Sequence, residues 1–194
     1  MSSREKILAA VKKNQPEGSP LPAVLSSSII TQDLAQRFQT ILTSIGGLVV
    51  EVNDWTKIKD HILLNFAESK RIVSTLSELA IITGITNFKD DSHLLEDVDL
   101  AILQGHFGVA ENGAIWITED QMGNRALPFI AQHLALIIQK NEIVSTLHEA
   151  YDRIETMNYD FGTFIAGPSK TADIEQSLVL GAHGPKSMTV FLIS

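Results

Sequence analysis

The spacing of apolar residues between positions 31 and 75 constrains the fold more than any other feature of this sequence. From Thr31, a favourable N-cap, apolar side chains recur at helical spacing until Gly46 and Gly47. Residues 48–52 then have strand character, Asp54 can cap a second helix, and residues 71–75 form another strand-like run. Because a helix between two such strands normally makes a right-handed crossover, the pattern predicts an α/β fold with a mostly parallel sheet.

The remainder of the chain continues this pattern. Strands are predicted at residues 98–103, 108–110, 114–118, 133–138, 163–166 and 188–193, and a helix at 145–157. After the strand at 163–166, we expect the chain to turn at Gly167 into a helix that runs through residues 178–180 to Gly181. The segment from Leu76 to Glu96 gives no clear pattern.

Chain length and proline content predict the domain organisation. The 194 residues fit one large domain better than two. A short helix capped by Ser3 can extend to about Lys13, and three prolines and a glycine follow it. We therefore expect an N-terminal helical arm and linker at residues 1–22 and a single α/β domain at residues 23–194. The arm is either a mobile terminus or a contact that builds a homo-oligomer.

Charge and composition exclude several classes of function. A net charge of −8 disfavours nucleic acids and anionic membranes. No stretch approaches the roughly 20 apolar residues needed to cross a bilayer, and the N-terminal apolar run is too short for a signal peptide, so we expect a cytoplasmic protein. With no cysteine, these residues cannot supply a disulfide, a thiolate nucleophile or thiolate ligands for an iron–sulfur cluster. Histidine spacing predicts no metal site.

The segment after Gly167 has the strongest signal for a ligand site. A turn between a parallel strand and a helix exposes backbone N–H groups and the positive end of the helix dipole. Ser169 and Thr171 add hydroxyl donors and Lys170 adds a positive charge, so an anionic cofactor or metabolite is the expected ligand. The spacing is not that of a nucleotide-binding P-loop. Alternatively, a hydroxyl merely caps the helix and Lys170 faces water.

Two further residues are candidates for catalysis. Glu111 lies between short apolar segments, where burial would raise the pKa of its carboxyl and suit it to act as base or nucleophile. The alternative is that Glu111 is an exposed turn residue. His183 stands in a turn beside Gly184, where it can bind a ligand or move a proton, or serve only the turn itself. Arg125 can hold a carboxylate or phosphate with two hydrogen bonds, or form a surface ion pair.

Several of these segments together resemble the lactate utilization protein C family. They are residues 108–115 (GVAENGAI), Arg125 before an apolar Leu-Pro pair, the strand at 133–138, and residues 165–186 (IAGPSKTADIEQSLVLGAHGPK). The resemblance extends from about Leu34 to the last residue. It implies a three-layer fold similar to the sugar-phosphate isomerase, formyltetrahydrofolate cyclo-ligase and coenzyme A-transferase group.

The resemblance also implies a function. It suggests an accessory or substrate-handling subunit in the oxidation of L-lactate to pyruvate, beside partner proteins that carry iron–sulfur clusters. It does not decide whether this chain is itself catalytic, and it names no cofactor. Asn112, where the family is expected to have Thr or Ser, makes residues 110–113 similar to the Ser-Glu-Asn-Gly motif of coenzyme A-transferases, whose glutamate forms an acyl intermediate.

That similarity supports an alternative function. The chain would then be a free-standing enzyme or binder of a phosphorylated, folate or acyl-CoA metabolite, with Glu111 as base or nucleophile. A third hypothesis is a homo-oligomeric scaffold without a small ligand. If Ala110 and Ala166 end strands of one parallel sheet, we expect Glu111 to face Ser169 and Lys170 across a cleft, lined by His183 and closed by Arg125.

Overall fold

The computed structural model describes residues 2–16, 18–19, 33–83, 91–172 and 178–194. The chain divides into two compact units, Met1–Thr31 and Gln32–Ser194. In the first unit, α1 (Ser3–Lys13) begins after Ser2, and a capping box joins Ser2 and Glu5. The helix therefore starts one residue earlier than a cap at Ser3 would allow. None of its side chains is buried.

The second unit contains a five-stranded sheet in the order β1-β11-β6-β3-β2. Every neighbouring pair in it is parallel. Its strands are β1 (Leu48–Val52), β2 (Ile72–Ser74), β3 (Leu100–Gln104), β6 (His133–Gln139) and β11 (Ser187–Ile193). The three central strands are almost continuously apolar and buried on both faces, as parallel strands covered from both sides require. The predicted α/β class and mostly parallel sheet are confirmed.

A second sheet of four strands, which the prediction did not separate from the first, has the order β7-β4-β5-β8. Its strands are β4 (Phe107–Val109), β5 (Ala114–Thr118), β7 (Ile143–Val144) and β8 (Gly162–Ile165). β5 pairs antiparallel with both β4 and β8, whereas β4 and β7 are parallel. The strands near Ala110 and Ala166 therefore belong to this sheet, and their expected place in the parallel sheet is wrong.

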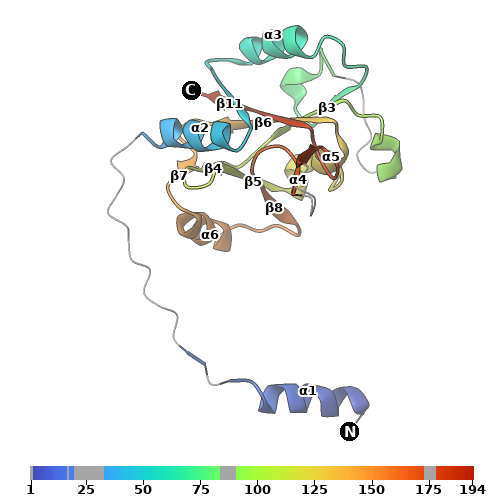
Figure 1. The fold of residues 1–194 in the computed structure, drawn as a ribbon, viewed down its shortest axis with the longest axis vertical. Coiled ribbons are helices and arrows are strands. Elements are labelled where there is room, and N and C mark those ends of the chain that lie inside the picture. Colours follow the sequence, from blue (N-terminus) through green and yellow to red (C-terminus); the bar gives the residue numbers. More distant parts are fainter. Residues whose placement is uncertain (1, 17, 20–32, 84–90, 173–177) are drawn as a thin grey trace. The chain divides into compact units, whose positions relative to one another are not determined.

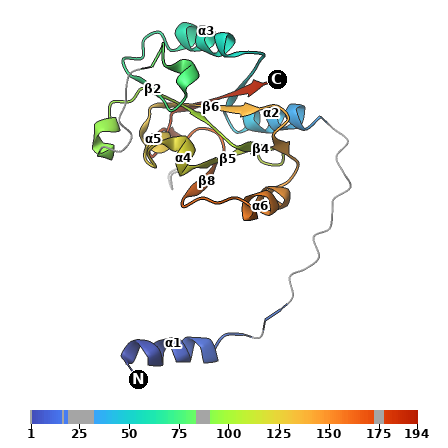
Figure 2. The same ribbon diagram turned by 180° about the vertical axis from the view of Figure 1, so that it is seen from behind.

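Apolar clusters join the layers of this unit. α3 (Trp55–Asn65) buries Ile58 and Ile62 on one face of the parallel sheet. The opposite face packs on the four-stranded sheet, together with α2 (Leu34–Ser44), α4 (Glu119–Met122) and α5 (Leu127–Ile130). The outer face of the second sheet is covered by α6 (Leu147–Glu155). Figure 1 shows α3 and α6 on opposite sides of the two sheets, and Figure 2 shows the same order from behind.

Local capping explains where several helices begin. Asp33 accepts hydrogen bonds from the backbone N–H groups of Ala35 and Gln36, so it caps α2; the cap predicted at Thr31 lies outside the described residues. Asp54 caps α3 as predicted. Short 3-10 helices, η1 (Ser77–Leu79) and η2 (Ser92–Leu95), stand in the segment that gave no clear pattern. No helix of the described residues is long and apolar enough to cross a membrane.

The helix predicted after Gly167 is wrong. The chain instead forms β9 (Lys170–Ala172) and β10 (Leu178–Leu180), which pair antiparallel, while residues 173–177 lie outside the described part. Two backbone hydrogen bonds hold the base of this pair: the Ser169 N–H donates to the Pro185 carbonyl and the Gly181 N–H donates to the Ser169 carbonyl. These hydrogen bonds hold the residue before β9 next to the residues after β10. The two segments therefore pair as strands instead of forming a helix.

Candidate functional site

The topology of the second sheet brings the predicted site segments to one edge. β4 and β8 both run antiparallel to β5, so their carboxyl ends lie at the same edge. Glu111 follows β4 and Gly167 follows β8. The carboxyl end of α2 lies against both segments: a Cβ at Gly113 would stand 3.1 Å from the Leu42 backbone, and a Cβ at Gly167 would stand 3.2 Å from Ile45.

Glu111 is exposed and has a structural partner. Its carboxylate accepts a 2.7 Å hydrogen bond from the backbone N–H of Leu147, the first residue of α6. The charge thus lies where the helix dipole favours an anion. The burial expected from the neighbouring apolar residues is wrong, because the Glu111 side chain is exposed, as the alternative of a turn residue had it. Its part in catalysis remains a prediction.

Residues 167–172 and 178–184, the described parts of the Gly167–Gly184 segment, contain no helix N-terminus of the kind on which the anion-cradle hypothesis rested. Gly167 has a φ of 72°, which suits glycine, and packs on Ile45. The Lys170 ammonium lies beside Gly46, because a Cβ at Gly46 would stand 3.3 Å from its Nζ. This places the cation at the carboxyl end of α2, where the helix dipole is negative. Lys170 therefore lies near the end of α2, and its part in binding a ligand stays a prediction.

The other residues of this segment are arranged around the base of the β9–β10 pair. A Cβ at Gly184 would stand 3.1 Å from the Ser169 Cβ, so Gly184 permits these two stems to approach. His183 is exposed in the turn that follows β10. Thr171 pairs with Val179 through the backbone, and its side chain lies outside the described part. Ligand binding by these residues stays a prediction.

Arg125 lines a cavity of about 760 Å³ with Ser92, Gly123, Asn124 and three carboxylates, those of Glu119, Asp120 and Asp160. Its guanidinium donates a 2.7 Å hydrogen bond to Glu119 and lies 5.2 Å from the centre of the Phe161 ring. This hydrogen bond lowers the pKa of Glu119 and raises that of Arg125. The Arg125 side chain is still 55% exposed, so the guanidinium is oriented but accessible.

The polar cluster beside this cavity was missed by the sequence analysis. A smaller hollow of about 120 Å³ shares Glu119, Asp120 and Asp160 with it and adds Tyr159. His106 Nε2 lies 2.7 Å from Oγ1 of Thr118, which also lines the hollow. Burial lowers the pKa of His106, Arg153 lowers it further, and Asp120 raises it. The signal that could have found this cluster is the position of its residues after strands, since His106 follows β3 and Glu119 comes directly after β5.

The charged side chains of this cluster limit the ligands that the cavity can bind. Three carboxylates against one guanidinium give the lining of the cavity a net negative charge, and Arg125 is its positively charged side chain. Among the described residues, no group of three or more histidines and carboxylates has the geometry to hold a metal ion. The guanidinium is thus the best-defined group for recognising a carboxylate at this site.

Comparison with known proteins identifies the family. The sequence model of the LUD domain matches residues 86–193. The chain belongs to the LUD domain family. The match includes Glu111, Arg125 and the Gly167–Gly184 segment, and it confirms the resemblance inferred from those residues.

Two curated relatives of this LUD-domain chain have the same name. Lactate utilization protein C of Anoxybacillus flavithermus is 26% identical over 157 residues, which cover 80% of this chain and 67% of the relative. Lactate utilization protein C of Bacillus pumilus is 29% identical over 111 residues, which cover 54% of this chain and 46% of the relative. The chain therefore spans two thirds of the first relative and about half of the second.

A solved structure shares the fold. The crystal structure of a DUF162 family protein from Deinococcus radiodurans superimposes with a TM-score of 0.62 at 18% identity. The superposition covers 83% of this chain and 96% of that one. The two-sheet architecture of this LUD domain is thus shared with a protein of experimentally determined structure.

Proposed function

We propose that this chain acts in lactate utilization as an accessory or substrate-handling subunit. The relatives named lactate utilization protein C support this role. The absence of cysteine from these 194 residues adds a chemical argument, because a two-electron oxidation of lactate then needs a bound organic cofactor or a partner that carries thiolate-ligated clusters. The partners proposed are iron–sulfur subunits of a lactate-oxidising complex.

The observation that supports substrate handling is the accessible guanidinium of Arg125. Phe161 and Glu119 hold it in one orientation while half of the side chain stays exposed. A small carboxylate such as lactate would replace Glu119 and accept two parallel hydrogen bonds, whose planar geometry matches a carboxylate. Because the ligand displaces Glu119, Arg125 selects a carboxylate that binds it more tightly than the Glu119 carboxylate does.

Binding to Arg125 is tested by calorimetry with lactate, pyruvate and acetate on the intact chain. Arg125→Gln should weaken binding of a carboxylate about 10- to 100-fold, the equivalent of one bidentate charged contact. Arg153→Gln is a matched control, because Arg153 also pairs with a glutamate, Glu142, and lies 4.7 Å from the centre of the Phe107 ring. Equal binding by both variants would contradict the assignment of Arg125.

The partner proposal needs a separate experiment. The chain should be recovered from its native cells under mild conditions, and proteins that accompany it should be identified by mass spectrometry. Recovery with a protein that carries an iron–sulfur cluster, shown by its visible absorption, supports the subunit role. Recovery of this chain alone under several conditions would contradict it.

A free-standing enzyme or binder of a phosphorylated, folate or acyl-CoA metabolite is the second candidate function. The position of Glu111 and Gly167 at one edge of the second sheet favours it. A ligand at about 100 times its dissociation constant should raise the free energy of unfolding by about 2.7 kcal/mol, which thermal-shift screening detects. If the Glu111→Gln variant keeps full activity on the ligand identified by this screen, Glu111 has no part in the mechanism.

A further inference from the structure

A second cavity lies at the amino-terminal edge of the parallel sheet. It has a volume of about 530 Å³ and is lined on one side by residues 64–69, at and after the end of α3. Asp99, His133 and Ser187 line the other side. These three residues stand just before or at the first positions of β3, β6 and β11, which are adjacent in the sheet.

His133 and Ser187 are hydrogen-bonded inside this cavity. They are direct neighbours in the parallel register, and His133 Nδ1 lies 2.7 Å from Ser187 Oγ. The Phe66 ring packs edge-on against the imidazole with centroids 5.6 Å apart. The backbone N–H of His133 donates to the Asp99 carbonyl at 2.8 Å. The imidazole is therefore held on the strand, against Phe66 and next to a hydroxyl.

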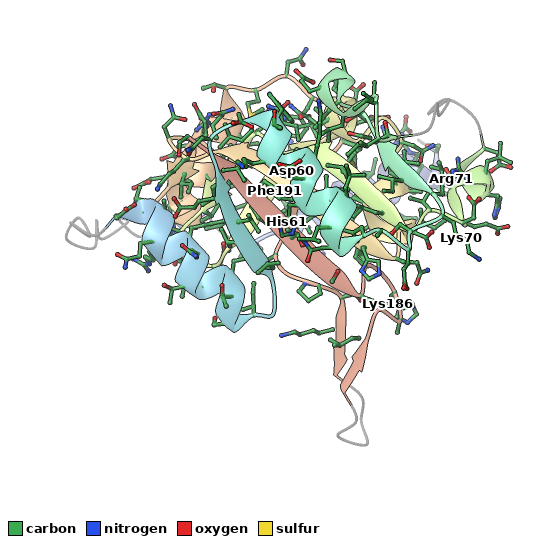
Figure 3. All side chains as sticks on the ribbon, turned by 90° about the horizontal axis from the view of Figure 1, so that it is seen from above. Asp60, His61, Lys70, Arg71, Lys186 and Phe191 are labelled. Atoms are coloured by element: carbon green, nitrogen blue, oxygen red, sulfur yellow. The ribbon has the colours of Figure 1, made fainter. Side chains whose placement is uncertain are left out.

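The surroundings of the pair favour a neutral imidazole, mainly through burial. Burial lowers the pKa of His133, Lys186 lowers it further, and Asp99 opposes both effects. The Asp99 carboxylate is fixed by the backbone N–H groups of Lys70 and Arg71 at 2.6 and 3.1 Å. Figure 3 shows Lys70, Arg71 and Lys186 at this edge of the molecule, beyond the end of α3. A neutral imidazole can accept the Ser187 hydroxyl proton.

The lining also indicates the class of ligand. Leu64, Phe66 and Ala67 offer apolar surface, whereas Glu68 and Asp99 contribute the carboxylates. An anionic ligand would be repelled by those carboxylates. An uncharged molecule with a carbonyl group fits the combination of apolar surface and a hydroxyl–imidazole pair.

We propose that this cavity is an esterase-type site in which Ser187 is the nucleophile and His133 the general base for an uncharged carboxylic ester. The proposal does not depend on the lactate role, because the Arg125 cavity is lined by different residues. Asp99 is a positioning residue that favours the protonated imidazole through its charge.

The reaction proceeds in two balanced steps. Ser187 Oγ forms a bond to the carbonyl carbon while His133 takes the hydroxyl proton; the ester C–O bond then breaks, and His133 gives that proton to the leaving alcohol. Water next attacks the acyl-serine with His133 as base. This releases the carboxylic acid and restores the serine hydroxyl.

The experiment uses the full chain, a fluorophosphonate probe and an uncharged p-nitrophenyl ester. Mass spectrometry of peptides should locate the phosphonyl group on Ser187, and hydrolysis of the ester should stop when Ser187 is labelled. Ser187→Ala should abolish labelling, and His133→Gln should slow it about 100-fold or more. Ser69→Ala, a serine in the same cavity, should be labelled like the unaltered chain.

Circular dichroism confirms that each variant is folded before its rate is compared. Labelling of the unaltered chain decides the proposal even if a variant fails to fold. No phosphonyl group on Ser187, or equally fast labelling of a folded His133→Gln variant, would overturn the proposal.

Discussion

At the scale of single residues, three partly buried histidines share one electrostatic property. The pKa values of His61, His106 and His133 all lie below the ordinary value of 6.5, and burial is the largest cause for each. The His61 ring packs edge-on against Phe191 with centroids 5.2 Å apart, and Figure 3 labels His61 on α3 and Phe191 on β11. The fold therefore favours the neutral form at these positions.

This property predicts a pH dependence of stability. Below about pH 6.5 the unfolded chain binds protons at these histidines that the folded chain does not, so the free energy of unfolding should fall as the pH decreases. The urea midpoint at about pH 5.5 should be lower than at about pH 7.5, and His106→Gln should reduce the difference. Histidine NMR signals that titrate at or above 6.5 would contradict the prediction.

Gly162 gives a second prediction for a single residue. A Cβ at this position would stand 2.4 Å from Trp116 Cζ2, so Gly162→Ala must displace a buried indole in the core between the second sheet and α6. We expect a loss of about 1–3 kcal/mol in the free energy of unfolding, measured by urea denaturation. Gly18→Ala is the control, because a Cβ there meets no atom within 4 Å. Equal stability of both variants would exclude the predicted clash.

At the scale of elements, the Glu111 contact ties the β4–β5 turn to α6. Removing this carboxylate with Glu111→Ala leaves the Leu147 N–H without its partner and should cost about 0.5–2 kcal/mol, as the loss of a helix cap does. Glu155→Ala is the matched control at the opposite end of α6, where a negative charge is unfavourable, so stability should stay equal or rise slightly. Chemical denaturation of both variants measures the difference.

Some elements are determined by consecutive residues and others by contacts between distant residues. The apolar runs of β3, β6 and β11 and the cap at Asp54 were predicted because each signal is contained in a few consecutive residues. The β9–β10 pair was predicted as a helix because its cause is not local. The contacts that hold its stems join Ser169 to Gly181 and Pro185, across the whole intervening segment.

At the scale of the whole molecule, the division into two compact units leads to a prediction about removal of residues 1–31. α1 buries no side chain, so a chain that begins at Gln32 should unfold in a single transition with an unchanged midpoint. Thermal unfolding of the full and shortened chains tests this. A lower midpoint of the shortened chain would show that residues 1–31 stabilise the second unit.

The same two chains test the oligomer hypothesis. Light scattering should give a smaller mass for the shortened chain, beyond the loss of its own residues, only if residues 1–31 hold copies together. The exposed apolar side chains of Ile7, Leu8 and Val11 are the residues of α1 available for such a contact. An oligomer that survives truncation would assign the interface to the second unit.

The sequence by itself determined the α/β class, the apolar strands of the parallel sheet and the choice of Arg125 as a candidate for binding an anion. These features depend on periodicity and residue chemistry within a few consecutive residues. Only the tertiary structure decided which sheet each short strand joins and what surrounds each candidate. His133 and Ser187 are 54 positions apart in the chain, and Glu111 meets Leu147 across 36. Such contacts depend on strand order and register, which the packing of the whole chain sets and no local pattern contains.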